Sequence, residues 1–271
     1  MPIRLSLPPT FRDCLAATDR PLVGMWVSSG SPLVAEICAG AGLDWVLLDG
    51  EHSPIGLEST VAMLQAMAPY PVTPVVRVPW GDAVVLKQVL DLGVQNVLVP
   101  MVDTAEHARA AVRAVRYPPR GVRGVASALA RASRWDRVEQ YVERAHELVS
   151  LVVQIESAEA VANAADIAAV EGVDGVFVGP ADLAASMGLL GQQTHPDVVE
   201  AVLRTFDAVR GAGKPVGVNA FDPVAARSYL DAGASFVAVG ADVSLLARGS
   251  EKLADAWIPD GVASDEEAQG S

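Results

Sequence analysis

Short apolar segments rich in valine, leucine and isoleucine recur along the whole chain. Apolar residues are nearly continuous in them rather than alternating with polar ones, a pattern typical of strands buried on both faces of a parallel sheet. We therefore predict eight strands, at 22–27, 45–49, 74–78, 97–101, 151–155, 175–179, 215–219 and 236–240.

Helical patterns lie in most of the gaps between these strands. Ser31 can cap a helix that has Pro32 in its first turn and ends at Gly40 or Gly42. Further helices, several of them closed by a glycine, are predicted over 82–91, 104–116, 158–170, 196–212 and 222–232. Eight strands that alternate with helices predict an α/β fold of the (β/α)8 or TIM-barrel type.

The gap between the fourth and fifth predicted strands is longer and irregular. It contains the proline- and glycine-rich run from Tyr117 to Gly124, and then a helix expected at about 134–149. We expect this insertion at the active face, as a lid or a subunit contact. The domain division expected is an N-terminal extension (1–20), one barrel domain (21–257) and a flexible acidic tail (258–271).

The composition excludes several classes of partner. A net charge of −13 argues against nucleic-acid binding, which requires clustered Lys and Arg. No segment approaches the roughly 20 apolar residues of a membrane span, and no signal-peptide pattern is present. The two cysteines, Cys14 and Cys38, fit neither a disulfide framework nor a zinc site, so we expect a cytoplasmic protein.

Polar residues gather where the predicted strands end. In barrel enzymes the chemistry lies at the carboxyl-terminal ends of the strands. The residues at those ends include one histidine, one arginine and several carboxylates, but no cysteine or serine nucleophile with an obvious base. They are Trp26, Asp49, Glu51, His52, Arg77, Gln154, Glu156, Asp182, Asn219 and Asp242.

Two of these carboxylates, Glu156 and Asp182, follow neighbouring strands. Carboxylates side by side in a barrel mouth repel each other unless a cation lies between them. Their hard oxygen atoms suit Mg²⁺ or Mn²⁺ and leave coordination positions for water and a chelating substrate. Spacing alone leaves another interpretation open, in which Asp182 caps a helix and Glu156 forms a surface salt bridge.

Three more residues have two interpretations each. His52 is a natural proton carrier near neutral pH, or a solvated loop residue. Arg77 can bind a carboxylate or an enolate oxygen, or it can pair with Asp49 or Glu51. Asp91 ends a helix just before Gly93, where the helix dipole disfavours an anion. Asp91 therefore either serves a function outside its own helix or is an ordinary exposed aspartate.

The motifs along the chain, taken together, resemble one known family. They are Gly24-Met25-Trp26, Leu48 to Pro54, Val76 to Pro79, Leu90 to Gly93, Tyr117-Pro118-Pro119 with Gly121 to Gly124, Gln154-Ile155-Glu156 and Gly179 to Leu183. Over roughly residues 20–250 the chain is similar to the hydroxy-oxoheptanedioate aldolases and 2-dehydro-3-deoxyglucarate aldolases. These belong to the class II, metal-dependent pyruvate aldolases, a family that also includes 2-keto-3-deoxyrhamnonate aldolases.

The resemblance implies a reaction and a cofactor. The reaction is reversible aldol cleavage of a 4-hydroxy-2-oxo acid to pyruvate and an aldehyde, through a pyruvate enolate stabilised by a divalent metal. The metal is Mg²⁺ or Mn²⁺, with Co²⁺ as an alternative, and its ligands are Glu156 and Asp182. Arg77 is implied to bind the keto or enolate oxygen, and His52, oriented by Asp49, to act as the acid and base.

The resemblance also implies how the substrate and the subunits are arranged. Backbone N–H groups near Ala181 and Asp182 bind the pyruvate carboxylate, and Asp91 reaches the site of a neighbouring subunit. The final helix, at about 242–256, is exchanged between subunits of a homo-hexamer, a trimer of dimers. The other residues implied to line the substrate pocket are Trp26, Gln154, Gly179 and Pro180.

One position departs from the usual pattern of the family. Asn219 stands where many relatives have an apolar residue, and we expect it to face the aldehyde half of the substrate and to favour a hydroxylated acceptor. Two other functions stay open. A coenzyme A thioester lyase of the citrate-lyase-like branch needs a basic groove, for which the sequence offers only Arg113, Arg116, Arg120 and Arg123. A non-catalytic metabolite-binding barrel would be expected to have lost Glu156, Asp182, Arg77 or His52, and the sequence has all four.

Overall fold

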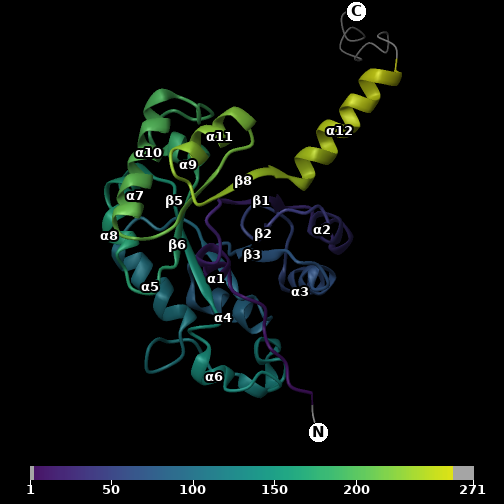
Figure 1. Cartoon of the computed structure of the whole chain (residues 1–271), viewed down its shortest axis with the longest axis vertical. Coiled ribbons are helices and arrows are strands. Elements are labelled where there is room, and N and C mark those ends of the chain that lie inside the picture. Colours follow the sequence, from purple (N-terminus) through teal and green to yellow (C-terminus); the bar gives the residue numbers. More distant parts are fainter. Residues whose placement is uncertain (1–2, 259–271) are drawn as a thin grey trace, which may run out of the picture.

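Eight parallel strands close into a barrel in the computed structural model, which describes residues 3–258 (Figure 1). The strands follow chain order around the barrel, and β8 pairs with β1. The predicted (β/α)8 fold is confirmed, and each predicted strand is displaced by at most two residues at either end. The strands are β1 (Leu22–Val27), β2 (Trp45–Asp49), β3 (Thr73–Arg77), β4 (Asn96–Val99), β5 (Ser150–Ile155), β6 (Gly175–Val178), β7 (Val216–Asn219) and β8 (Phe236–Ala241).

Helices cover the outside of the barrel. Ser31 caps the first of them as predicted, by accepting a hydrogen bond from the N–H of Val34. The single helix predicted over 158–170 is instead two short ones, because Asn163 leaves helical geometry between them. The surrounding helices are α2 (Pro32–Ala39), α3 (Leu57–Met67), α4 (Ala83–Asp91), α5 (Ala105–Val115), α7 (Ala158–Ala162), α8 (Ala164–Ala168), α9 (Pro180–Ser186), α10 (Pro196–Gly211) and α11 (Pro223–Asp231).

Aromatic side chains fill the inside of the barrel. The rings of Phe177 and Phe236 stack with centroids 5.9 Å apart, and Trp45 lies edge-on to both. Two strand glycines leave the necessary space, since a Cβ at Gly24 would overlap the ring of Trp45 and one at Gly217 the ring of Phe236. The interior is therefore a packed core, and an open site can form only at its ends.

The N-terminal segment closes one end of the barrel. Its short helix α1 (Phe11–Ala16) begins at a capping box formed by Thr10 and Asp13. The buried ring of Phe11 lies 5.4 Å from that of Trp45, and its N–H donates to Asn96 Oδ1 at 2.6 Å. These contacts lie at the amino-terminal ends of the strands, so the opposite rim remains open.

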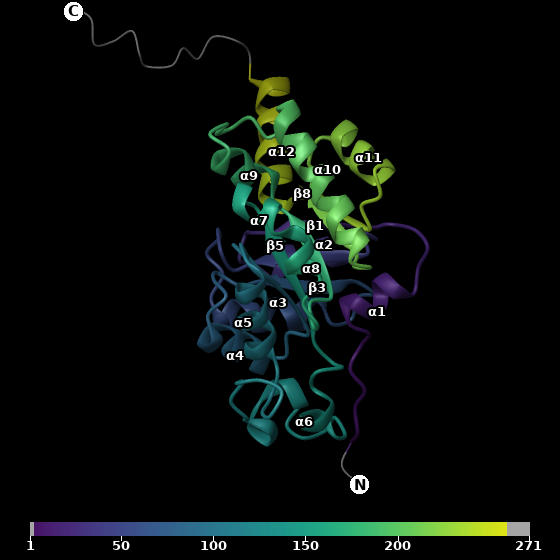
Figure 2. The ribbon, with the colours of Figure 1, turned by 90° about the vertical axis from the view of Figure 1, so that its left-hand side faces the viewer.

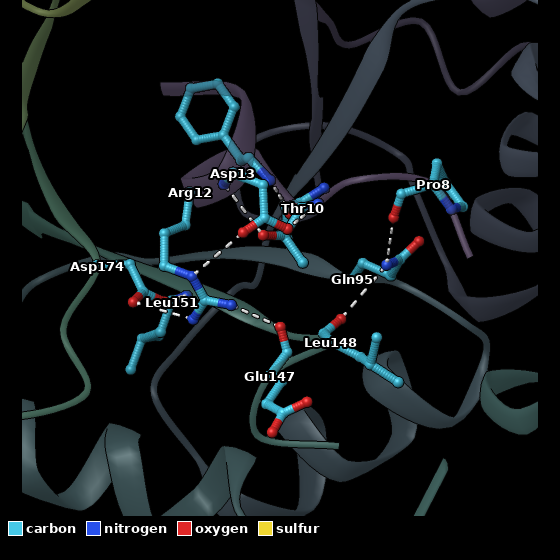
Figure 3. Close-up of polar contacts among 11 residues, drawn as sticks. Pro8, Thr10, Arg12, Asp13, Gln95, Glu147, Leu148, Leu151 and Asp174 are labelled. Carbon is cyan, nitrogen blue, oxygen red and sulfur yellow. Dashed lines mark hydrogen bonds and ion pairs between the residues drawn. The ribbon is translucent and has the colours of Figure 1, made fainter. Parts of the chain in front are cut away.

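The insertion before β5 lies at this same closed end, next to the N-terminal segment that precedes α1 (Figures 1 and 2). Arg12 Nη2 donates to the carbonyl of Glu147, and the Gln95 amide donates to the carbonyls of Pro8 and Leu148 (Figure 3). The prediction that the insertion lies at the active face is wrong. Helix α5 has already returned the chain to the amino-terminal ends of the strands before the insertion begins.

The insertion also contains less helix than expected. It forms two 3-10 turns, η1 (Ser127–Leu129) and η2 (Arg131–Ser133), and one short helix, α6 (Tyr141–Arg144). The helix predicted over 134–149 is wrong outside α6. Backbone φ angles between 51° and 64° place Arg134, Trp135, Asp136 and Gln140 in the left-handed region, which a right-handed helix cannot include.

The last helix, α12 (Asp242–Trp257), extends away from the barrel (Figures 1 and 2). Every residue of α12 after Asp242 is exposed. None of the helices within residues 3–258 is long and apolar enough to cross a bilayer. Of the acidic tail predicted at 258–271, only Ile258 falls within the described residues.

Candidate active site

A pocket of about 240 Å³ opens at the carboxyl-terminal ends of the strands. It brings together ten of the residues that the sequence singled out, from six different strands or the loops and helices that follow them. These are Trp26, Asp49, His52, Arg77, Gln154, Gly179, Pro180, Ala181, Asp182 and Asn219. The same pocket is lined by Ser28, Phe177, Phe221 and Ala241.

Arg77 ends β3 and is nearly fully buried. Its Nε lies 2.9 Å from Asp49 Oδ1 and its Nη1 lies 2.8 Å from Glu51 Oε2. The guanidinium carbon lies 4.4 Å from the centre of the Trp26 ring, a cation–π contact. Both proposed carboxylate partners are therefore real, and they hold the guanidinium rigidly at the pocket wall rather than removing it from the site.

Asp49 organises the loop after β2. Besides Arg77, its Oδ1 accepts the backbone N–H groups of Glu51 at 3.1 Å and His52 at 3.4 Å. The His52 ring is largely exposed, and its Nε2 lies 3.6 Å from Glu51 Oε2. In this structure Asp49 thus acts on the backbone of His52, and Glu51 is the carboxylate beside the imidazole ring.

Glu156 follows β5 and is 3% exposed. Its Oε1 accepts the N–H of Met101 at 2.8 Å, and its Oε2 accepts the side-chain amide of Gln154. A Cβ at Gly179 would lie 2.8 Å from Glu156 Oε2, so a glycine is required where the chain leaves β6. The alternative of a surface salt bridge is wrong for Glu156, because the carboxylate is buried.

Asp182 lies in the first turn of α9. Gly179 occupies the N-cap position, and no side chain caps this helix, so the alternative role of Asp182 as a helix cap is wrong. Ala181 and Asp182, at the start of α9, are exposed and line the pocket. N–H groups in the first turn have no partner within the helix and attract anions.

Asn219 and Trp26 are joined across the mouth of the barrel. The indole Nε1 of Trp26 donates to Asn219 Oδ1 at 2.8 Å, which links the end of β7 to β1. The Trp26 ring also packs on the Arg77 guanidinium. A substitution at residue 219 would therefore remove a hydrogen bond from the ring that contacts Arg77.

Asp91 lies outside this pocket, at the end of α4 and near the closed end of the barrel. Its Oδ1 accepts a hydrogen bond from Arg123 Nη2 at 2.7 Å. The side chain of Arg123 is fully buried, and its guanidinium carbon lies 4.5 Å from the centre of the Tyr117 ring. Asp91 is therefore not simply exposed, and it takes no part in the active site of its own chain.

The chain matches the family described as HpcH/HpaI aldolase/citrate lyase over residues 22–249. The chain belongs to the HpcH/HpaI family. It is 56% identical over 257 residues to a hydroxypyruvate/pyruvate aldolase of Deinococcus radiodurans, an alignment that covers 94% of this chain and 92% of that one. It is 51% identical over 244 residues to a 4-hydroxy-2-oxo-heptane-1,7-dioate aldolase of Salmonella paratyphi B, covering 90% and 92%.

A solved structure of an HpcH/HpaI family protein from Burkholderia cenocepacia superposes with a TM-score of 0.87 at 41% identity. The superposition covers 90% of this chain and 97% of that one. The family expected from the motifs is thus confirmed.

The carboxylates of this site are suited to binding a divalent cation. Burial, together with the negative charges of Asp182 and Glu51, raises the pKa of Glu156 to about 7. Burial also raises the pKa of Glu51. The buried Oε1 of Gln154 has no hydrogen-bond partner among the described residues. Clustered anions with a free amide oxygen suit a hard cation.

Residues 3–258 contain no group of three or more His, Cys, Asp or Glu side chains arranged to hold a metal. A cation site formed by Glu156 and Asp182 would therefore have two carboxylate ligands from the described residues. Most coordination positions would remain for water and for a substrate with two oxygen donors.

Several residues of this site had escaped prediction. Glu51 was expected as an alternative to Asp49 in pairing with Arg77, but not as a partner beside it, nor as the carboxylate next to the His52 ring. Met101, which donates its N–H to Glu156, was expected to end the fourth strand. It follows β4 instead and has a left-handed φ of 54°. Phe177 could have been found as an apolar residue near a strand end, whereas nothing in the local sequence distinguishes Phe221.

The raised pKa of Glu156 predicts a pH dependence of stability in the metal-free protein. Since the folded-state pKa is about 7 and the ordinary value is 4.5, folding favours the protonated carboxyl. The stabilisation is complete below pH 4.5 and is lost as the pH rises through 7, by roughly 3 kcal/mol in total. Glu156→Gln cannot ionise, so it should lack this loss.

Urea denaturation of both proteins in chelator, at acidic and at alkaline pH, measures this difference. The wild type should lose more stability than Glu156→Gln on going to alkaline pH. An identical pH dependence in the two proteins would contradict the assignment.

Proposed function

We propose that this chain is a class II pyruvate aldolase. It cleaves a 4-hydroxy-2-oxo acid, of the hydroxy-oxoheptanedioate or 2-keto-3-deoxy sugar acid type, reversibly to pyruvate and an aldehyde. The observation that carries the proposal is a buried, carboxylate-held Arg77 that lines one pocket with Asp182. The Glu156 carboxylate lies directly behind Gln154 and Gly179 of the pocket wall, where the charge of Asp182 helps to raise its pKa. The names of the two relatives, a hydroxypyruvate/pyruvate aldolase and a 4-hydroxy-2-oxo-heptane-1,7-dioate aldolase, support it.

Glu156 and Asp182 hold the divalent cation in this proposal, Mg²⁺ or Mn²⁺ with Co²⁺ as an alternative. When bound, the cation would be chelated by the 2-oxo acid and would offset negative charge that develops on the keto oxygen. Gln154 keeps Glu156 in place by donating a side-chain amide N–H to Glu156 Oε2. The buried position of Glu156 keeps this charge interaction strong, because little water screens it.

The remaining residues bind and orient the substrate. The N–H groups of Ala181 and Asp182, at the start of α9, receive the substrate carboxylate. Gly179 and Pro180 form the adjoining backbone wall. Arg77 donates to the keto oxygen, on which an enolate charge grows as the bond between C3 and C4 breaks.

His52 carries the proton. In the cleavage direction it accepts the proton of the C4 hydroxyl, directly or through a water, while the C3–C4 electron pair moves into the enolate. Its exposed ring can exchange this proton with solvent, and its Nε2 lies 3.6 Å from Glu51 Oε2. Asp91 of a neighbouring subunit completes the site in the assembly.

Proton–deuterium exchange at the methyl group of pyruvate tests this proposal without any assumption about the aldehyde. Chelator-treated protein is followed by NMR in deuterated buffer, with and without added Mg²⁺ or Mn²⁺. We expect exchange that depends on the metal, because enolate formation removes a methyl proton. Absence of exchange with every divalent metal would contradict the aldolase proposal.

The coenzyme A lyase has no comparable support. Of the four arginines that could have formed a basic groove, Arg113 pairs with Glu106 and Arg116 with Glu171. Arg123 is buried against Asp91. Among the described residues the cluster is thus largely neutralised.

We further propose that the chain forms a homo-hexamer, a trimer of dimers, in which α12 is exchanged between subunits. The helix carries exposed apolar side chains at Leu245, Leu246, Leu253 and Trp257. Because α12 projects outward, the barrel face beside β1 and β8 lacks its last helix, and Leu33 and Ile37 of α2 are 66% and 65% exposed. The α12 of a second subunit can cover them.

Charges on the apolar face of α12 should therefore break the assembly. Burying one leucine stabilises an interface by about 1.5–3 kcal/mol, so the pair Leu246→Glu and Leu253→Glu should give smaller species. Size-exclusion chromatography with light scattering measures this, and Lys252→Glu on the same helix serves as the control. A double variant that stays hexameric would contradict the exchange of α12.

Asn219 is proposed to set the preference for the aldehyde. Asn219→Leu loses the hydrogen bond to Trp26 and a polar group in the pocket. We expect kcat/KM for hydroxylated aldehydes to fall about tenfold relative to aliphatic ones, since one hydrogen bond contributes roughly 0.5–1.5 kcal/mol. Rates with a matched aldehyde pair measure the ratio, and an unchanged ratio would refute the role.

A further inference from the structure

A second cavity, of about 370 Å³, lies at the closed end of the barrel. It shares no lining residue with the active-site pocket. Its walls come from the N-terminal segment, the end of α3, the first residues of β3 and β4, and the insertion. Gln95 forms part of the rim, where its amide donates to the carbonyl of Pro8 at 3.1 Å (Figure 3).

Two arginines of the insertion, Arg131 and Arg134, line this cavity. Both side chains are half-buried, and their hydrogen bonds go to backbone carbonyls. Arg131 Nη1 donates to Leu92 O at 2.7 Å, and Arg134 Nη1 donates to Arg131 O at 2.6 Å. Neither arginine has a carboxylate within ion-pair distance in residues 3–258.

This lack of a partner is unusual in the molecule. Every other arginine in the described residues that is buried or half-buried has a carboxylate partner: Arg12, Arg77, Arg116 and Arg123. The chain is also strongly acidic, with a net charge of −13, so carboxylates are abundant. Two neighbouring guanidiniums that remain unpaired in such a chain indicate that a further anion belongs between them.

The backbone leaves room for the two guanidiniums at Gly93. This residue has a φ of 90°, and a Cβ there would lie 2.6 Å from Arg134 Nη1 and 2.9 Å from Arg131 Nη1. The two cationic groups therefore converge over the same glycine. Burial lowers the pKa of both arginines, and the charge of Arg134 lowers that of Arg131 further. An anion at this point would relieve both effects.

The rest of the cavity is mainly apolar. Its walls include Leu64, Met67, Pro71 and Pro74. The volume falls within the range of about 300–1,000 Å³ that is usual for small-molecule sites. A ligand that fits this cavity has an anionic group at one end and an apolar body at the other.

We propose that this cavity is a binding site for a small organic anion. Its carboxylate or phosphate group lies between Arg131 and Arg134, and its apolar body packs against Met67 and Pro71. The site is separate from the proposed aldolase centre and requires no metal.

Calorimetric titration of the full-length, chelator-treated protein tests the proposal with two probes, benzoate and phenyl phosphate. We expect one of them to bind with a Kd below about 1 mM, and the tighter one identifies the anionic group. Arg134→Gln should weaken this binding about tenfold or more, because it removes a charge-assisted hydrogen bond. Arg137→Gln, an exposed arginine of the same segment, is the matched control and should bind as the wild type does.

Two measurements keep the test decisive. Metal-dependent exchange of pyruvate should be unchanged in Arg134→Gln, which shows that the variant is folded and separates this site from the aldolase centre. Arg134→Lys should restore part of the affinity, since it restores the charge. The proposal is overturned if neither probe binds, as when a neighbouring copy of the chain covers the cavity, or if Arg134→Gln binds as tightly as the wild type.

Discussion

Replacing Arg77 with alanine is expected to lower kcat for aldol cleavage by about 10²–10³-fold, equivalent to roughly 3–4 kcal/mol of transition-state stabilisation. The guanidinium is held between Asp49 and Glu51, at 2.9 and 2.8 Å, so it needs no rearrangement to meet the keto oxygen. Its charge interacts more strongly with an enolate than with a neutral ketone. The loss should therefore fall on kcat more than on substrate affinity.

The affinity for the divalent metal should survive in Arg77→Ala, because the proposed ligands, Glu156 and Asp182, lie on other strands. Arg77→Lys is the matched variant. It keeps the positive charge but cannot bridge both carboxylates, and we expect an intermediate rate. Circular dichroism checks that the unpaired Asp49 has not unfolded the protein, since breaking a buried ion pair can cost about 3–5 kcal/mol. Near-normal turnover in Arg77→Ala would overturn its role.

Replacing Glu156 with glutamine is expected to abolish metal-dependent pyruvate exchange. The amide has almost the same shape and can still accept the N–H of Met101. It lacks the negative charge that binds the cation, so metal affinity should fall by more than the roughly 10–100-fold typical of losing an outer-shell partner. Calorimetric titration with Mn²⁺ measures the affinity, and NMR measures the exchange.

Glu159→Gln is the control for this experiment. It makes the same chemical change three residues further on, at an exposed position on α7. Asp182→Asn should reproduce the defect of Glu156→Gln if both carboxylates are ligands. The two main predictions differ in pattern, since Arg77→Ala retains the metal and loses turnover whereas Glu156→Gln loses both. Normal Mn²⁺ affinity in Glu156→Gln would exclude it as a ligand.

Residues at the mouth of the barrel were more predictable than those at its closed end. Once eight parallel strands are expected, residues at their carboxyl ends must meet at one rim, however far apart they lie in sequence. Strand order alone therefore predicts that Asp49, Arg77, Gln154 and Asp182 lie together, and all four line the pocket.

The insertion illustrates the limit of that reasoning. Its proline- and glycine-rich sequence indicates irregular structure, but not the end of the barrel on which it lies. That location follows from the path of α5 and from contacts with residues far away in sequence, such as Arg12 and Gln95. The left-handed φ angles of Arg134, Trp135, Asp136 and Gln140 could not be predicted either, because non-glycine residues rarely adopt this region.

The eight strands, the barrel, the family and the charged residues at the open rim could all be predicted before the structure was known. These depend on local periodicity and on residue order, which a sequence contains directly. Three features required the folded arrangement: Asp49 and Glu51 both hold Arg77, burial raises the pKa of Glu156 to about 7, and Arg131 and Arg134 lack a carboxylate partner among the described residues. Charge pairing and desolvation depend on neighbours in space, and the folded chain alone fixes which neighbours those are.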